Sequence, residues 1–217
     1  MCDKMDKKKL ILVGGGGHCK SVIDVAEGAG FQIQGILDIL ENVGKKVLGY
    51  SIVGTDDQIP DYVNDAVFVV TVGHIKDATI RIKLHQKIVD AGGTLATIIA
   101  STAHVSKYAQ IGEGSVIMHH TVVNADAIIG RGCIINTFAN IEHDARIGDY
   151  CHISTGAMIN GNCVVGNETF FGSQSVMVNG IEITSGCVIG AGSLVRKNIT
   201  QKGIYSGNPA ILKIKLP

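Results

Sequence analysis

The pattern of hydrophobic residues changes near residue 100. Before residue 97, short apolar runs alternate with segments of helical periodicity, whereas from Val105 one large apolar residue recurs every six positions. Alternating strands and helices predict a small parallel sheet, and an unbroken six-residue repeat predicts a parallel β-helix. We therefore predict two domains: an α/β domain over residues 1–100, and a β-helix with a C-terminal tail over residues 101–217.

The first region has a clear order of predicted elements. Its periodicity predicts strands over 9–13, 32–37, 66–72 and 94–99, with helices over 21–29 and 80–91. The first strand runs into Gly14-Gly15-Gly16-Gly17-His18, and the second ends on Asp38. The ends of parallel strands are where such sheets bind ligands, so these residues are the first candidates for a binding site.

The repeat, which extends from Val105 to about Thr200, has two constant positions. Every sixth residue from Val105 to Val195 is large and apolar, and the residue four further on is small except at Ile181 and Ile199. In a parallel β-helix each unit forms one short strand and one corner of a triangular prism. Three units make a coil of about 18 residues, and coils stack about 4.8 Å apart. The large residues should fill the prism, and the small ones should fit its tight corners.

The repeat also accounts for most of the cysteines. Cys133, Cys151, Cys163 and Cys187 all occupy the small position, so we expect them to be inert, buried residues. The absence of a C-x-x-C pair argues against a structural zinc site. The sequence suggests no partner for Cys2 or Cys19.

Composition excludes several classes of protein. The chain is 46% apolar with a net charge of zero and a pI near 7.1, which is a globular composition without the basic surface that nucleic acid requires. The apolar run Leu10–Val13 is too short for a signal peptide or a membrane span. We therefore expect a cytoplasmic protein with no membrane insertion.

The glycine run suggests a phosphate site in a Rossmann-like domain. Glycines between a strand and a helix allow close approach of phosphate, and Asp38, at the end of the second strand, suits a ribose or a base. A dinucleotide fingerprint needs a third glycine where Cys19 stands, and the predicted sheet is small. We therefore favour a nucleotide-linked sugar over NAD.

The C-terminal half of the chain resembles a known family. The hexapeptide repeat closed by Gly207-Asn208-Pro209-Ala210 resembles the bacterial hexapeptide acyltransferases. This resemblance implies a left-handed β-helix, acetyl-CoA as co-substrate without a metal, and a homotrimer with coenzyme between subunits.

The N-terminal domain, together with the segments Ile135-Asn136-Thr137 and Ile141-Glu142-His143-Asp144, is similar to one subfamily. That subfamily contains N-acetyltransferases of nucleotide-linked 4-amino sugars, of the UDP-bacillosamine and GDP-perosamine type, and also sialic acid O-acetyltransferases.

Acetyl transfer to an amine needs a general base with a pKa near neutrality. His143 is third in its hexad, a position that points off the prism wall, and Glu142 and Asp144 flank it. In the similar family this histidine is the base and the following acid tunes it. The alternative is an ordinary exposed histidine.

One coil further on, position 161 should lie over His143, and Gly161 leaves its backbone N–H open there. We predict that this N–H stabilises the oxyanion. The alternative is a glycine that a tight corner requires.

The resemblance implies further contacts. Substrate contacts would come from Gly16, Gly17, His18, Asp38, Ile39 and Gly73, and coenzyme contacts from His152, Ser173 and Ala191. Separately, we expect Asn136 to hold either the sugar of the substrate or His143. UDP-sugar members often have a second acid where this chain has Ile39.

We therefore predict an acetyl-CoA-dependent N-acetyltransferase of glycan biosynthesis. It would act on the 4-amino group of a nucleotide-linked amino-deoxy sugar, by direct transfer with His143 as base. The alternatives are a sialic acid O-acetyltransferase and a non-catalytic β-helix binding module. A zinc site of the β-helix carbonic anhydrase type would need a different histidine spacing from that of His104, His143 and His152, so no metal is expected.

Overall fold

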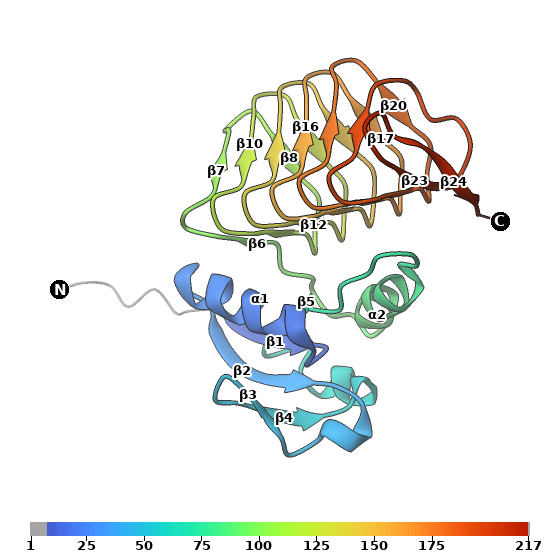
Figure 1. Ribbon diagram of the computed structural model, residues 1–217. Coiled ribbons are helices and arrows are strands. Elements are labelled where there is room, and N and C mark those ends of the chain that lie inside the picture. Colours follow the sequence, from blue (N-terminus) through green and yellow to red (C-terminus); the bar gives the residue numbers. More distant parts are fainter. Residues whose placement is uncertain (1–7, 217) are drawn as a thin grey trace.

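The computed structural model describes residues 8–216, in which an α/β domain lies against one side of a triangular prism (Figure 1). Cys2 lies outside the described residues. The N-terminal domain holds one five-stranded sheet in the order β3-β4-β2-β1-β5. All neighbours in it are parallel except the β3–β4 pair.

The predicted elements of this domain are confirmed to within a few residues, except for the strand over 94–99. The strands are β1 (Lys9–Val13), β2 (Gln32–Leu37), β3 (Lys46–Val47), β4 (Tyr50–Gly54) and β5 (Val67–Val70). The helices are α1 (Gly17–Gly28) and α2 (Thr79–Asp90), with short 3-10 helices at Leu40–Asn42 and Asp56–Asp61. The sequence analysis did not predict β3 and β4.

Three parallel sheets form the walls of the prism. The first, which we call the inner sheet because it faces the N-terminal domain, holds β6 (Ile98–Ile99), β9 (Val116–Ile117), β12 (Ile134–Ile135), β15 (His152–Ile153), β18 (Phe170–Phe171) and β21 (Val188–Ile189), and then β23 (Gly203–Ser206) and antiparallel β24 (Ile211–Lys215). The second holds β7 (His104–Val105), β10 (Val122–Val123), β13 (Asn140–Ile141), β16 (Met158–Ile159), β19 (Val176–Met177) and β22 (Leu194–Val195). The third holds β8 (Gln110–Ile111), β11 (Ile128–Ile129), β14 (Arg146–Ile147), β17 (Val164–Val165) and β20 (Glu182–Ile183).

The 18-residue coil is confirmed by the register of these strands. Ile135 pairs with Ile117 on one side and Ile153 on the other, so residues 18 apart stack on each other. The large hexad residues and the small ones share one buried core, in which all four predicted cysteines lie as free thiols. The second residue of most corners has a positive φ, as at Asp144 and Asn162.

The prediction that residues 94–99 form a strand of the α/β sheet was wrong. Only Leu95 makes an isolated bridge, to Phe68, and β6 instead pairs with β9 as the first strand of the prism. The physical reason is the hexad register, because Ile99 lies six residues before Val105.

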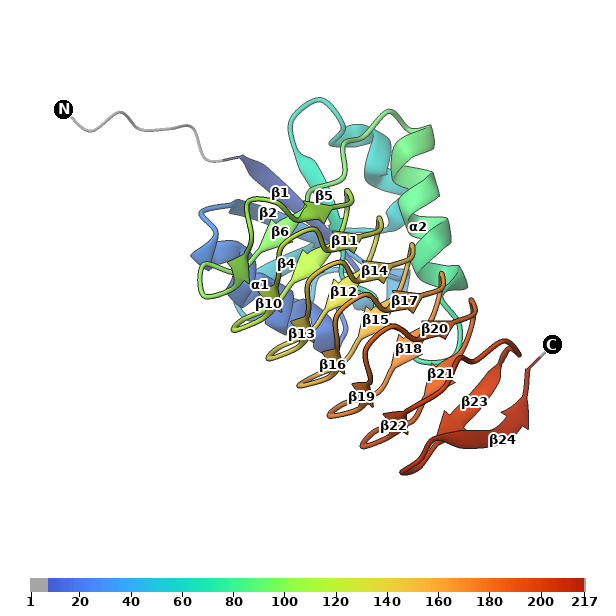
Figure 2. The ribbon, with the colours of Figure 1, turned by 90° about the horizontal axis from the view of Figure 1, so that it is seen from above.

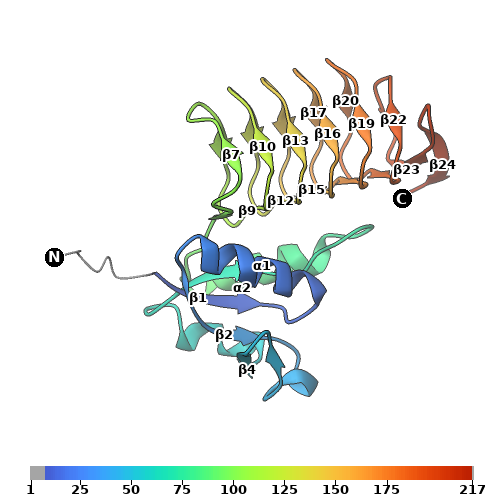
Figure 3. The ribbon, with the colours of Figure 1, turned by 60° about the vertical axis from the view of Figure 1, so that its left-hand side comes forward.

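The N-terminal domain packs on the inner sheet through its helices (Figures 2 and 3). Val22 and Ala26 of α1 share a hydrophobic core with Ile98, Val116 and Met118 of the prism. This packing fixes which side of the prism the glycine run faces. No helix within residues 8–216 is long and apolar enough to cross a membrane.

Candidate active site

His143 lies at the corner between β13 and β14, with 61% of its side chain exposed. Its Nδ1 is 2.8 Å from Asp144 Oδ2, so Nδ1–H donates to the carboxylate and Nε2 keeps a free lone pair. Asp144 reaches the ring because it occupies the left-handed position of the corner, with φ 61°. This geometry is that of a general base oriented by an acid.

Glu142 has a different role from Asp144. Its carboxylate accepts hydrogen bonds from Asn124 Nδ2 at 2.8 Å and Asn140 Nδ2 at 2.9 Å. The hydrogen bond to Asp144 raises the pKa of His143 above its usual value; desolvation of the ring acts against this, and the charges of Asp144 and Glu142 add to the rise. Asp144, not Glu142, therefore supports the ring directly.

We expect Asp144→Asn to shift the pH profile of the reaction. A base must be unprotonated, so kcat/KM falls as the pH falls through the pKa of His143. Without the carboxylate that pKa is lower, so the acidic limb should move to lower pH, while the plateau rate falls by about 10- to 100-fold because the ring loses its orientation. The measurement is kcat/KM for acetyl transfer across pH. Asp126→Asn, at the same corner one coil earlier, is the control and should leave the profile unchanged, and superimposable profiles for Asp144→Asn and wild type would contradict the assignment.

Gly161 lies over His143 as predicted, and the structure argues against a glycine that a tight corner requires. Its φ is not in the left-handed region, and the same corner position carries Ala125 and Asn179 in neighbouring coils, so the corner itself does not require glycine. A methyl group on Gly161 would lie 2.7 Å from both Cε1 and Nε2 of His143. The glycine therefore makes room for the edge of the imidazole that carries the free lone pair.

The glycine run lines a hollow of about 410 Å³ in the N-terminal domain. Its lining residues are Gly14, Gly15, Gly16, Gly17, His18, Asp38, Asn42, Thr71, Val72 and Gly73. Helix α1 begins at the hollow with Gly16 as N-cap and no side-chain cap, so its first N–H groups are open to an anion. Asn42 Nδ2 holds Asp38 Oδ2 at 2.9 Å.

Ile39, predicted beside Asp38, does not line this hollow. Its side chain is 61% exposed and borders a smaller neighbouring hollow of about 220 Å³, together with Ile80 and Leu84. This second hollow shares Gly14, Asp38 and Val72 with the first, so the two hollows are direct neighbours.

His152 joins the prism to the N-terminal domain. Its Nδ1–H donates to the carbonyl oxygen of His74 at 2.8 Å, and Asn136 Nδ2 lies 3.3 Å from its Nε2. Burial lowers the pKa of His152 to about 4; the bond to His74 raises it and the charge of Arg81 lowers it further. The structure thus brings together Asn136, predicted for the substrate, and His152, predicted for the coenzyme.

Ser173 and Ala191 lie at the corner between the first and second sheets, in successive coils. Ser173 Oγ is 2.9 Å from Ser154 Oγ, and Gly192 N–H donates to the Ser173 carbonyl. Ala191 is exposed. These residues form a line along one edge of the prism rather than a cluster.

The predicted residues form two groups that do not meet within one chain. The hollow belongs to the N-terminal domain, which packs on the inner sheet, and His152 is on that sheet. His143 and Gly161 instead lie at the corner between the other two sheets. In a triangular prism that corner is opposite the inner sheet. A ligand held in the hollow is therefore separated from His143 of the same chain by the width of the prism.

Sequence reasoning missed three polar residues between the domains. Arg81 and His85, both 1% exposed, and His74, 8% exposed, lie where helix α2 and the preceding loop meet the prism. The i, i+4 spacing of Arg81 and His85, continued by Ile88, is the sequence signal that could have found a buried helix face here.

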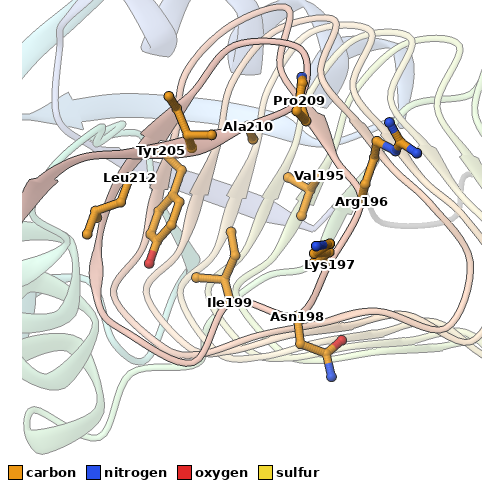
Figure 4. Close-up of a pocket in the computed structure, with 10 residues that line it drawn as sticks. Val195, Arg196, Lys197, Asn198, Ile199, Tyr205, Pro209, Ala210 and Leu212 are labelled. Atoms are coloured by element: carbon orange, nitrogen blue, oxygen red, sulfur yellow. The ribbon is translucent and has the colours of Figure 1, made fainter.

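A larger hollow, of about 550 Å³, opens at the C-terminal end of the prism (Figure 4). Its lining includes Val195, Ile199 and Tyr205, with Arg196 and Lys197 also in the wall. Strand β22, which precedes the hollow, lies three coils beyond β13. This hollow is therefore remote from the corner that carries His143.

Comparison with known proteins agrees with both halves of the structure. Residues 9–88 match the family described as PglD N-terminal domain, and residues 126–161 match the bacterial transferase hexapeptide family, with six repeats. The match to a chloramphenicol acetyltransferase of Klebsiella aerogenes is 46% identical over 50 residues, and the chain spans only 24% of that relative's length.

Solved structures match over nearly the whole chain. A histidine-to-asparagine variant of perosamine N-acetyltransferase from Caulobacter crescentus, in complex with CoA and GDP-perosamine, is 31% identical with a TM-score of 0.89, covering 94% of this chain and 96% of that one. The acetyltransferase domain of PglB from Neisseria gonorrhoeae, in complex with acetyl coenzyme A, is 30% identical with a TM-score of 0.88, covering 95% and 100%. The chain belongs to the family of left-handed β-helix, hexapeptide-repeat sugar N-acetyltransferases with a PglD-type N-terminal domain.

Proposed function

We propose that the protein transfers the acetyl group of acetyl-CoA to the 4-amino group of a nucleotide-linked amino-deoxy sugar. The observation that carries the proposal is the pairing of a histidine oriented by Asp144 with a separate, glycine-lined hollow at a helix N-terminus. The relatives support it, because solved members of the family are complexes with CoA and GDP-perosamine or with acetyl coenzyme A.

The chemistry follows from the position of His143. The sugar amine attacks the thioester carbonyl, and Nε2 of His143 accepts the proton that the amine loses as the C–N bond forms. The tetrahedral oxyanion is stabilised by the N–H of Gly161, which donates to no other acceptor within residues 8–216. The C–S bond then breaks, and the proton on His143 passes to the departing CoA thiolate.

The two groups of residues act together in a homotrimer. Because His143 is across the prism from its own hollow, the nucleotide sugar held by one subunit is acetylated at His143 of a neighbour. Acetyl-CoA lies between the two prisms, along the edge that carries Ser173 and Ala191. The sugar of the bound nucleotide approaches Asn136 and Gly73, and Asp38 binds the nucleoside.

Mixed trimers test this arrangement. Gly17→Asp puts a negative charge in the hollow without a clash, because nothing lies within 4 Å of a Cβ at that position, and it should abolish nucleotide binding. Trimers co-expressed from equal amounts of Gly17→Asp and His143→Ala chains should regain about a quarter of wild-type activity, since about one site in four combines an intact hollow with an intact neighbouring histidine. Each variant alone should be inactive. Mixed trimers without activity would contradict a site shared between subunits.

An acceptor panel tests the reaction itself. Thiol release from acetyl-CoA is measured with UDP-, GDP- and dTDP-linked 4-amino sugars and with free sialic acid. We expect release only with a nucleotide-linked amino sugar. Release with sialic acid alone would make the protein an O-acetyltransferase, and no release with any acceptor would contradict the proposal. We place the reaction in the cytoplasm, where acetyl-CoA and nucleotide sugars are available to glycan biosynthesis.

A further inference from the structure

Arg81 is a buried cation without an acidic partner. Its side chain is 1% exposed and ranks among the largest fully buried side chains of the protein. No carboxylate within residues 8–216 forms an ion pair with it. Burial lowers its pKa, to about 10, so the guanidinium still carries its charge at neutral pH. An unpaired buried charge is costly, and its retention calls for an explanation.

The guanidinium is satisfied by carbonyl groups from both domains. Nη1 donates to the carbonyl oxygens of Val70, at 2.6 Å, and Val72, at 3.0 Å. Nε donates to Gly132 at 2.8 Å and Nη2 to Gly114 at 3.4 Å. Gly114 and Gly132 are 18 residues apart and therefore stack at one corner of the prism. The planar fork of arginine suits this set of four acceptors in a way that a lysine would not.

The carbonyls on the N-terminal side belong to the wall of the hollow. Val72 lines it directly, and Val70 is the last residue of β5. Between them, Thr71 donates its N–H to Val13 O at 2.8 Å, and its hydroxyl donates to the carbonyl of Gly14. Arg81 thus fixes the strand end that in turn holds the start of the glycine run.

The hollow contains no cation of its own. Among the described residues that line it, Asp38 carries the only formal charge and none is lysine or arginine. His18 does not compensate, because burial and then the charge of Arg81 lower its pKa to about 3. A diphosphate placed here meets one carboxylate and the N-terminus of α1. At the exposed rim, Lys45 Nζ donates to Asn42 Oδ1 at 2.8 Å; the buried positive charge behind the wall is the guanidinium of Arg81, held at Val72.

We propose that Arg81 is a positioning residue for the nucleotide-sugar hollow: it fixes the strand end Val70–Gly73 to the prism, and its buried charge offsets the diphosphate of the substrate. The inference rests on the proposed function, because that function supplies the diphosphate. The hydrogen bond from His152 to the His74 carbonyl ties the same loop to the prism a few residues further on. Arg81 and His152 together set the hollow relative to the coils that bind coenzyme.

The test compares Arg81→Met, Arg81→Lys and a control, Arg131→Met. Arg131 lies at the same prism corner but is 58% exposed and paired with Asp149. Calorimetry measures the binding of UDP and GDP, and steady-state kinetics give kcat and the KM values for nucleotide sugar and acetyl-CoA. Loss of a charge-assisted network should weaken binding of the nucleoside diphosphate by at least about tenfold in Arg81→Met. The KM for acetyl-CoA should stay within about twofold of wild type.

Arg81→Lys separates the contribution of the buried charge to diphosphate binding from the role of the guanidinium in fixing the strand end to the prism. It keeps the charge, so nucleoside diphosphate affinity should recover to within about threefold of wild type, whereas kcat should stay at least about tenfold low because an ammonium cannot hold both domains. Arg131→Met should behave as wild type throughout. A folded Arg81→Met that binds UDP and GDP within about twofold of wild type would overturn the inference.

Two further measurements test the inference if Arg81→Met does not fold. The first is the kcat of Arg81→Lys, and a wild-type value would overturn the role of Arg81. The second is the binding of uridine and guanosine by the wild-type protein, compared with that of UDP and GDP. We expect the diphosphates to bind at least about 30-fold more tightly, and equal binding would overturn the inference. If the wild-type protein binds neither diphosphate and acetylates no nucleotide sugar, the proposed function itself fails. If it does both while the Arg81 variants are unchanged, only the role of Arg81 is wrong.

Discussion

Replacement of His143 by glutamine should lower kcat by at least about 10²-fold while leaving the fold intact, because a general base contributes about 10²- to 10⁴-fold. The side chain is 61% exposed and its hydrogen bond is to the adjacent Asp144, so its loss removes no packing. The KM for acetyl-CoA should change little. The measurement is thiol release from acetyl-CoA, with mass spectrometry of the acetylated sugar.

The residual rate of this variant carries further information. Without a base, only substrate whose amine has already lost its proton to solvent can react, so the remaining rate should rise with pH instead of reaching a plateau near neutrality. His104→Gln is the matched control, since His104 is an exposed histidine of the same prism, on β7, and it should retain wild-type activity. A His143→Gln enzyme with more than about a tenth of wild-type activity would rule out His143 as the base.

The sequence was most informative where one physical constraint repeats. Each hexad must place a large residue inside the prism and a small one after the corner, and this constraint predicted the register of three sheets and the burial of Cys133 and Cys151. Register in turn predicted that residue 161 lies over residue 143. The prediction from the repeat was wrong only at its start, because Ile99 already obeys the repeat but was assigned to the preceding domain.

The sequence was least informative where the two domains meet. Nothing in the spacing of Arg81, His85 and His74 says that they face another domain, because an arginine on a short helix is exposed in most proteins. Their burial depends on the docking of helix α2 against the corner of the prism at Gly114 and Gly132, which brings together residues more than 30 positions apart. The separation of His143 from the hollow was likewise invisible until the three sheets were placed around the prism.

The support of His143 by Asp144 lies between these cases. The sequence showed two carboxylates beside His143, Glu142 and Asp144, and did not show which of them supports the imidazole ring. The choice depends on backbone geometry, since Asp144 occupies the left-handed corner position while Glu142 extends along the wall toward Asn124 and Asn140. Local contacts of this kind follow from the turn, not from the residue types.

Gly161→Ala should lower kcat by about 100-fold, because a displacement of about 1 Å at a reacting group has effects of this size. The added methyl group would lie 2.7 Å from Cε1 and Nε2 of His143, so the exposed ring must swing away and lose its hydrogen bond to Asp144. That bond raises the pKa of His143, and its loss should move the acidic limb of the kcat/KM profile to lower pH.

The stability of the Gly161→Ala variant separates displacement of the ring from damage to the prism. The methyl group meets only movable side-chain atoms, so the free energy of unfolding should stay within about 0.5 kcal/mol of wild type. Ala125→Ser adds one atom at the equivalent corner position two coils earlier and should leave both rate and pH profile unchanged. Gly161→Ala keeps the backbone N–H that would stabilise the oxyanion, so it tests only the space that the glycine leaves. A wild-type rate would show that the position of the imidazole does not depend on the absence of a side chain at residue 161. A low rate with an unshifted pH profile would instead indicate that the methyl group blocks the thioester rather than the base.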